Sequence, residues 1–190
     1  DSALMLNVTA GFDGFDATLH RERPENYTKS LKREIKGMKL GIPKEYVAQG
    51  LQKDVKEVFE KVVKIFEELG AIIVEVSLPN TEYGNATYYI IQPSEVSSNL
   101  ARFDGIRFGN DRSHFGDEAK RRIMLGTFTL SAGYYDAYYK KALQVRTLIK
   151  NDYDKAFEKV DALIAPVSPT LPWKLGEKIN DEKSICYWAW

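Results

Sequence analysis

Two adjacent arginines, Arg121 and Arg122, are the side chains in this sequence whose type best suits ligand chemistry. A guanidinium presents a planar fork of N–H donors, so it can bind a carboxylate or phosphate through two parallel hydrogen bonds. The stretch from residue 115 to 142 that contains them is either a ligand-binding surface or a packed helix. Without further context, both arginines are also explained as solvated charges on a helix.

Four tyrosines follow the arginine pair in the same stretch. They are Tyr134, Tyr135, Tyr138 and Tyr139. Spacings of three and four residues place side chains on adjoining faces of one helix. Large aromatic side chains at such positions usually pack, so we predict that these four mainly pack.

The familiar catalytic motifs are absent from this sequence. It contains neither the Gly-x-Ser-x-Gly turn of serine hydrolases nor the Gly-x4-Gly-Lys-Ser/Thr loop that binds nucleotides. Its histidines, His20 and His114, are far apart, and Cys186 is the only cysteine. No metal-ligand spacing or internal disulfide follows from these residues. We therefore predict no catalytic or metal-binding residue in the chain, and a reducing, cytoplasmic location.

The composition is that of an ordinary globular protein. The 190 residues are 44% hydrophobic and 28% charged. Lysine and arginine together number 27, as do aspartate and glutamate, so no overall field attracts nucleic acid or a membrane. No apolar run reaches the roughly 18 residues that a membrane span needs.

A strand, a helix and a second strand are predicted within residues 37–80. The run MKLGIP is short, apolar and closed by Gly and Pro, as buried strands are. From Asp54 to Leu69 apolar residues recur every three or four positions, which predicts an amphipathic helix that Gly70 ends. The β-branched run AIIVEVSLP predicts the second strand. Such a βαβ unit makes its two strands parallel, with a right-handed crossover.

The rest of the chain is predicted to be mainly helical. Residues 117–160 contain no proline and indicate two helices, with a break near Gly126 or Gly133. The run DALIAPVSPTLP predicts a strand that completes the sheet. We therefore predict an α/β fold: a mixed β-sheet with a βαβ unit and a mainly helical second half.

We predict one domain over residues 1–190. Its parts are a helix end and connector (1–36), the βαβ unit (37–80), a mainly helical segment with the closing strand (81–170) and a divergent tail (171–190). A sheet of this size would keep an open edge and an uncovered face, which favours self-association.

Long motifs in this chain resemble the amidase signature family. The matches include GIPKEY, SLPNTEYGNATYYII, SSNLARFDGIRFG, KRRIMLGTF and IAPVSPT. The segments SSNLARFDGIRFG and KRRIMLGTF resemble the branch that forms the A subunit of glutamyl-tRNA(Gln) amidotransferases. The resemblance implies a partial amidase fold. Two alternatives stay open: a non-catalytic interaction module on the amidase scaffold, and part of a general amidase for small amides.

The resemblance also implies a function for the complete enzyme. The A subunit would hydrolyse glutamine and pass ammonia to the B subunit, where ATP and Mg²⁺ activate glutamate on tRNA(Gln), and the C subunit would join the two. No cofactor is expected in this chain, and tRNA would be met only through the complex. In the family, the catalytic serine pair and lysine precede the region matched here. We therefore expect a fragment that does not hydrolyse glutamine alone.

Two residues match positions that the family uses to hold glutamine. By the resemblance, Arg122 would bind the α-carboxylate and Tyr88 would line the same pocket. An aspartate that binds the α-amino group has no counterpart here. Near these positions, Arg102, Asp104 and Arg107 surround a glycine turn. These charges either form a structural ion pair or take part in function.

Overall fold

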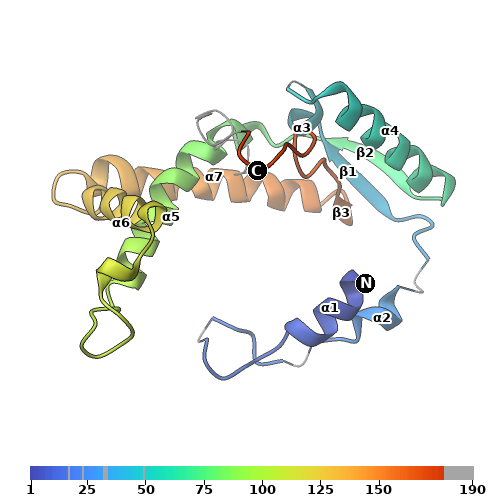
Figure 1. The fold of residues 1–190 in the computed structure, drawn as a ribbon. Helices are drawn as coiled ribbons and strands as arrows, with labels where there is room; N and C mark the ends of the chain where they lie inside the picture. The colour runs from blue at the N-terminus through green and yellow to red at the C-terminus, as the bar shows by residue number, and fades with distance from the viewer. Residues whose placement is uncertain (17, 23, 32–33, 49, 178–190) are drawn as a thin grey trace. The chain divides into compact units, whose positions relative to one another are not determined.

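A computed structural model describes most of the chain (Figure 1), namely residues 1–16, 18–22, 24–31, 34–48 and 50–177. Most of the predicted divergent tail, with Cys186, lies outside the described residues. Contacts divide the chain into two compact units, residues 1–37 and residues 38–190. Each unit is described by itself.

The first unit contains two helices. α1 spans Ser2–Thr9, where the sequence predicted the end of an apolar helix. α2 spans Tyr27–Ser30, inside the stretch that was expected to be a connector, and the side chain of Asn26 caps its N-terminus. The backbone N–H of Tyr27 donates to Asn7 Oδ1 over 2.9 Å. This bond ties the start of α2 to α1.

The second unit begins with the predicted βαβ arrangement. β1 spans Lys39–Pro43, α4 spans Lys53–Glu68 and β2 spans Ile72–Val76. A short helix, α3 (Lys44–Ala48), leads out of β1. The two strands pair in parallel over their full length. The predicted α/β fold and its βαβ unit are confirmed.

The closing strand joins the opposite side of β1. β3 spans Ala162–Leu163 and pairs with it in parallel, which gives the strand order β2-β1-β3. Gly41 makes this pairing possible, because a Cβ there would lie 2.6 Å from Leu163 Cδ2 and 3.0 Å from a methyl group of Val160. The side chains of Val160 and Leu163, which follow α7, therefore pack directly against the backbone of β1.

A small hydrophobic core joins the sheet to α7, which spans Lys141–Phe157. Its buried members are Val76, Leu78, Ala156 and Val160. Figure 1 shows α4 on one side of the sheet and the C-terminal end of α7 on the other. Helices on both faces are what a parallel sheet of this kind requires.

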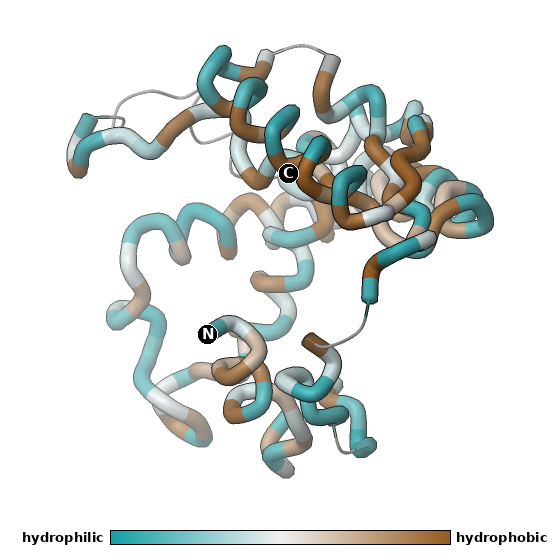
Figure 2. Tube along the Cα trace, turned by 90° about the vertical axis from the view of Figure 1, so that its right-hand side faces the viewer, coloured by the Kyte–Doolittle hydropathy of each residue, from teal (hydrophilic) through white to brown (hydrophobic). Residues whose placement is uncertain are grey.

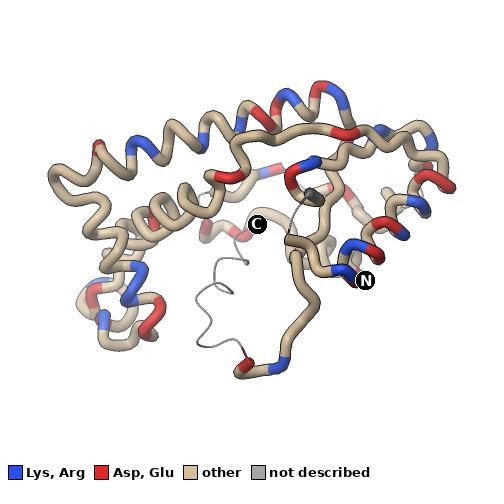
Figure 3. Tube along the Cα trace, turned by 90° about the horizontal axis from the view of Figure 1, so that it is seen from above, with Lys and Arg blue, Asp and Glu red and all other residues tan. Residues whose placement is uncertain are grey.

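Helix α4 has two apolar rows. One row is half-buried and consists of Val55, Phe59, Val63 and Phe66. The other is exposed and consists of Val58, Val62, Ile65 and Leu69. Figure 2 shows hydrophobic and hydrophilic residues interspersed along the helices of the chain, and Figure 3 shows basic and acidic residues interspersed along α4. The helix is thus amphipathic as predicted, but it buries only part of its apolar stripe in the described chain.

The remaining elements are helical. They are η1 (Pro79–Tyr83), α5 (Gly84–Leu100), η2 (Arg112–His114), α6 (Asp117–Thr129) and the π-helix η3 (Tyr135–Lys140), which runs into α7. The break between the predicted helices lies at Gly133, whose φ is 86°. The alternative break at Gly126 is wrong, since that residue is buried inside α6. None of the described helices is long and apolar enough to cross a membrane.

Candidate functional site

The close crossing of α5 and α6 builds the candidate site. A Cβ on Gly126 would lie 1.9 Å from the carbonyl oxygen of Pro93, so only a glycine allows the two backbones to approach this closely. One residue further along α6, the hydroxyls of Thr127 and Ser97 lie 2.9 Å apart. Arg122 lies one helical turn before Gly126, on the same face of α6. Because α6 crosses α5 at Gly126, this side chain points towards α5.

The guanidinium of Arg122 is held by three side chains. Its Nη1 donates to the Tyr88 hydroxyl over 3.0 Å and to Gln92 Oε1 over 2.7 Å, and its Nε donates to Glu118 Oε1 over 2.8 Å. Its guanidinium carbon lies 5.8 Å from the ring centre of Tyr88 and 5.9 Å from that of Tyr89. The side chain of Arg122 is only 22% exposed. This arginine is a fixed group against α5.

The structure brings together the two residues for which the resemblance implied a binding role. Arg122 and Tyr88 lie 34 positions apart in the sequence and share a hydrogen bond. Tyr88 lies on α5. The glutamine-binding role of both residues stays a prediction.

Glu118 couples the two arginines. Its Oε1 accepts from Arg122, and its Oε2 lies 2.9 Å from Arg121 Nη1. The bond to Glu118 is the main cause that raises the pKa of Arg122, against an opposing effect of burial. A second contribution comes from Tyr88. The guanidinium therefore keeps its charge at any physiological pH and can attract an anion.

Two residues of this cluster were not predicted from the sequence. Glu118 lies four positions before Arg122 on one helix, and that spacing alone indicates an ion pair. Gln92 approaches Arg122 across the crossing of two helices. Its sequence neighbourhood carries no local signal for that contact.

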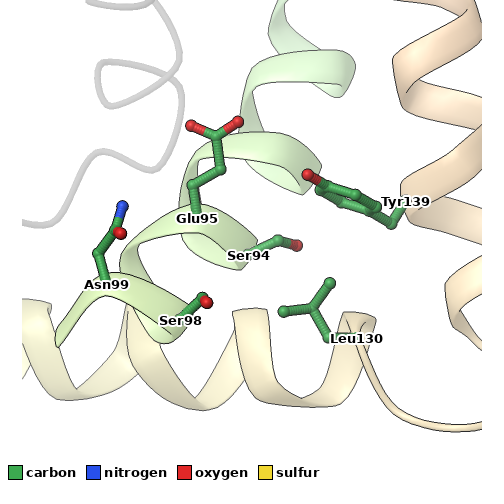
Figure 4. Close-up of a pocket in the computed structure, with 6 residues that line it drawn as sticks. All are labelled: Ser94, Glu95, Ser98, Asn99, Leu130 and Tyr139. Carbon is green, nitrogen blue, oxygen red and sulfur yellow. The ribbon is translucent and has the colours of Figure 1, made fainter. Parts of the chain in front are cut away.

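A pocket of about 220 Å³ lies beside α5, near the end of α6 and the π-helix. Its lining, drawn in Figure 4, consists of Ser94, Glu95, Ser98, Asn99, Leu130 and Tyr139. Most of these side chains are polar and come from one face of α5. The Ser94 hydroxyl already donates to the carbonyl of Ile90. Sequence reasoning missed this pocket, although Tyr139 was considered as a packing residue.

The tyrosines make ring contacts, but the prediction that they mainly pack holds only in part, because Tyr134, Tyr135 and Tyr138 are 40%, 44% and 48% exposed. Ring centres of Tyr134 and Tyr138 lie 5.8 Å apart, and those of Tyr135 and Tyr139 lie 5.3 Å apart. Phe128 from α6 approaches Tyr134 to 4.2 Å. These contacts link the end of α6 to the π-helix. The aromatic cluster therefore braces the helix that carries Arg122.

The turn after α5 is held by backbone hydrogen bonds. Asp104 Oδ1 accepts from the backbone N–H groups of Ile106 and Arg107, each over 2.9 Å. These bonds, with that from Arg107 the larger, lower the pKa of Asp104. Of the two alternatives for these charges, the structural ion pair is wrong, because no side-chain pair in the described residues joins Asp104 to Arg102 or Arg107. Arg102 Nε instead donates to the Asn99 carbonyl over 2.9 Å.

A second pocket, of about 260 Å³, lies at the carboxyl end of β2 and includes Asp152, Lys155 and Lys159 in its lining. The Asp152 carboxylate is buried and accepts from the backbone and side-chain N–H groups of Asn80, over 2.8 Å and 2.9 Å. Its role is thus structural. Across the described ranges, no three His, Cys, Asp or Glu side chains are grouped to hold a metal ion.

Comparisons with known proteins identify the family. A profile of the family described as Amidase matches residues 1–190. Among curated proteins, the glutamyl-tRNA(Gln) amidotransferase A subunit of Thermodesulfovibrio yellowstonii is 53% identical over 195 residues, which cover 95% of this chain and 40% of the relative. The protein of the same name from Lactiplantibacillus plantarum is 53% identical over 196 residues, with the same two coverages. The resemblance to the tRNA-dependent branch is confirmed.

Solved structures agree with this family. The crystal structure of the glutamyl-tRNA(Gln) amidotransferase A subunit from Thermotoga maritima matches 98% of this chain, and 38% of its own, with a TM-score of 0.72 and 36% identity. A bacterial aryl acylamidase of the amidase signature family shares the fold, with a TM-score of 0.66 over 90% of this chain and 35% of its own, at 22% identity. The chain spans about 40% of the length of the curated relatives it matches. By its sequence and its fold, the chain belongs to the amidase family.

Proposed function

We propose that this chain is part of the glutamine-hydrolysing subunit of a glutamyl-tRNA(Gln) amidotransferase, and that Arg122 binds the α-carboxylate of glutamine. The relatives that carry this name support the first part of the proposal. The second part is supported by the charged guanidinium, which Tyr88 and Gln92 hold in place on α5.

The proposed reaction needs partners. Hydrolysis of the glutamine side-chain amide yields glutamate and ammonia, and the ammonia would amidate Glu-tRNA(Gln) in a B subunit that binds ATP and Mg²⁺. A small C subunit would join the other two, and tRNA would be contacted only through the complex. The chain itself would bind no cofactor and would act in the cytoplasm.

The geometry of Arg122 suits the α-carboxylate. A guanidinium pairs with a carboxylate through strong charge-assisted bonds when its plane is fixed beforehand. Two acceptors from α5 fix that plane, and the rings of Tyr88 and Tyr89 flank the cation. The guanidinium of Arg122 is therefore already oriented before the ligand binds, so its side chain loses less conformational entropy on binding.

The test compares two ligands in the full chain by isothermal titration calorimetry. Glutamine carries the α-carboxylate, whereas 4-aminobutanamide has the same side-chain amide and amine without it. Arg122→Gln should weaken glutamine binding about 10- to 100-fold, which is the range for losing hydrogen bonds to a charged group. Binding of 4-aminobutanamide should not change.

Arg146→Gln is the matched control, because Arg146 is an exposed arginine on α7 away from the crossing. It should leave both affinities unchanged. Equal affinity of wild type and Arg122→Gln for glutamine would refute the binding role. Ammonia release in the assembled complex, measured with the same variants, tests the reaction itself.

A further inference from the structure

The donors of Arg122 are unequally occupied. A guanidinium carries five N–H groups: one on Nε and two on each terminal nitrogen. Nη1 donates to Tyr88 and to Gln92, and Nε donates to Glu118. No acceptor among the described residues meets Nη2. The edge formed by Nε and Nη2 is therefore the one along which an incoming carboxylate can make two parallel bonds.

Within the described chain, one group stands on that edge, and it is itself a carboxylate. Glu118 Oε1 accepts from Nε, so a ligand carboxylate cannot use the whole edge while Glu118 stays there. The acceptors on Nη1 come from a different helix, and Gln92 is half-buried. Glu118 is 56% exposed and can turn towards solvent. Of the three partners of Arg122, Glu118 is the one on this edge, and its side chain is exposed.

Glu118 has a second partner, Arg121, when it leaves Arg122. Its Oε2 already lies 2.9 Å from Nη1 of Arg121, whose side chain is 71% exposed. Glu118 can therefore break its bond to Arg122 and still keep its ion pair with Arg121. Because Glu118 keeps its contact with Arg121, breaking its bond to Arg122 does not leave an unpaired carboxylate.

We infer that Glu118 occupies, in the ligand-free chain, the edge of Arg122 at which the ligand carboxylate binds, and that it leaves Arg122 and keeps only its contact with Arg121 when the ligand arrives. This inference rests on the proposed function of Arg122. It makes Glu118 an internal competitor that lowers the affinity for glutamine. A ligand without a carboxylate cannot displace it, so Glu118 acts only on ligands that use this edge.

If Glu118 competes with the ligand, removing its charge should increase the affinity for glutamine. In the full chain, Glu118→Gln should tighten glutamine binding about 2- to 5-fold, the amount expected when one exposed ion pair no longer competes. It should leave the affinity for 4-aminobutanamide unchanged. Asp117→Asn is the matched control, because it removes the same charge one residue earlier, and no contact within the described part of the chain joins Asp117 to Arg122. It should change neither affinity.

A double-mutant cycle tests the role of Arg121. Arg121→Gln removes the alternative partner, so it should weaken glutamine binding in the wild-type background. In the Glu118→Gln background it should have no effect, because no carboxylate then needs that partner. Such a difference between backgrounds measures the coupling directly.

The outcomes separate this inference from the proposed function. If Arg122→Gln loses glutamine binding while Glu118→Gln binds no more tightly than wild type, the exchange is refuted and the proposed function stands. A gain from Asp117→Asn equal to that from Glu118→Gln also refutes it. If Arg122→Gln binds glutamine as wild type does, both fail. Should Glu118→Gln unfold at the assay temperature, Glu118→Ser must show the same gain.

Discussion

Nη1 of Arg122 lies 2.7 Å from Oε1 of Gln92, and this bond joins α6 to α5 across 30 positions of sequence. The half-buried Gln92 accepts from the cation and helps to fix its plane. Gln92→Met keeps a side chain of similar length but removes the acceptor. It should weaken glutamine binding about tenfold, the effect of losing one hydrogen bond to a charged group.

The same measurement distinguishes positioning from a loss of stability. Calorimetry should show no change in 4-aminobutanamide binding by Gln92→Met, because that ligand does not use Arg122. Gln144→Met, on α7 and away from the crossing, should affect neither ligand. An unchanged affinity of Gln92→Met for glutamine would remove Gln92 from the site.

A methyl group at Gly126 should force α5 and α6 apart. Its Cβ would lie 1.9 Å from the Pro93 carbonyl oxygen, which is part of the backbone and cannot rotate away. Gly126→Ala should lower the free energy of unfolding by about 1 to 3 kcal/mol, as overpacking usually does. It should also weaken glutamine binding, because Arg122 lies one turn away. Thermal and urea unfolding, with the ligand titration, measure both effects.

Gly84→Ala is the control for this change. Gly84 lies in the first turn of α5, and a Cβ there would meet nothing within 4 Å. Alanine favours a helix over glycine by roughly 0.5–1 kcal/mol, so this variant should be as stable as wild type or slightly more stable. A similar loss of stability in both variants would show that the crossing is not the cause.

Glu45 should make the stability of the second unit depend on pH. Its carboxylate accepts from the backbone N–H of the fully buried Leu78 over 2.8 Å and from the Ser77 hydroxyl over 2.5 Å. Partial burial raises the pKa of Glu45, but these hydrogen bonds outweigh it and the net pKa is lowered. The unfolded chain therefore takes up this proton more readily than the folded chain.

The resulting stability is present above the unfolded pKa of about 4.3 and is lost as pH falls through the lower pKa of the folded state. Wild type should therefore lose stability as the pH falls below about 5, and Glu45→Gln should lose less over the same range. Urea unfolding at a series of pH values gives both curves. Parallel curves for the two proteins would contradict this role of Glu45.

Local patterns in the sequence determined much of the fold. The helix from Asp54 to Leu69 follows from spacings of three and four residues, because such spacings decide which side chains share a face. The strands on either side of it follow from short apolar and β-branched runs that end at Gly or Pro. Amphipathic periodicity also predicted the helical second half. The family itself was readable from long motifs, which carry the information of many neighbouring residues at once.

Interactions between distant segments decided the rest. Gly126 looked like a possible break because glycine weakens an isolated helix, but packing against Pro93 keeps it inside α6. At Gly126 the contact between two helices therefore decided between a break and a continuous helix. Asp104 shows a local selection instead: an ion pair with an arginine was one of its two alternatives, and its carboxylate accepts from the backbone N–H groups of Ile106 and Arg107.

The site shows the same division. The sequence by itself determined that Arg122 and Tyr88 are present, and the resemblance implied that they act together. Only the crossing of α5 and α6 brought Gln92 and Tyr88 to the cation, whereas Glu118 reaches it by spacing within α6. The physical reason is that a hydrogen bond depends on the distance between two atoms in space. Sequence spacing sets that distance within one helix, but it does not set it between two helices.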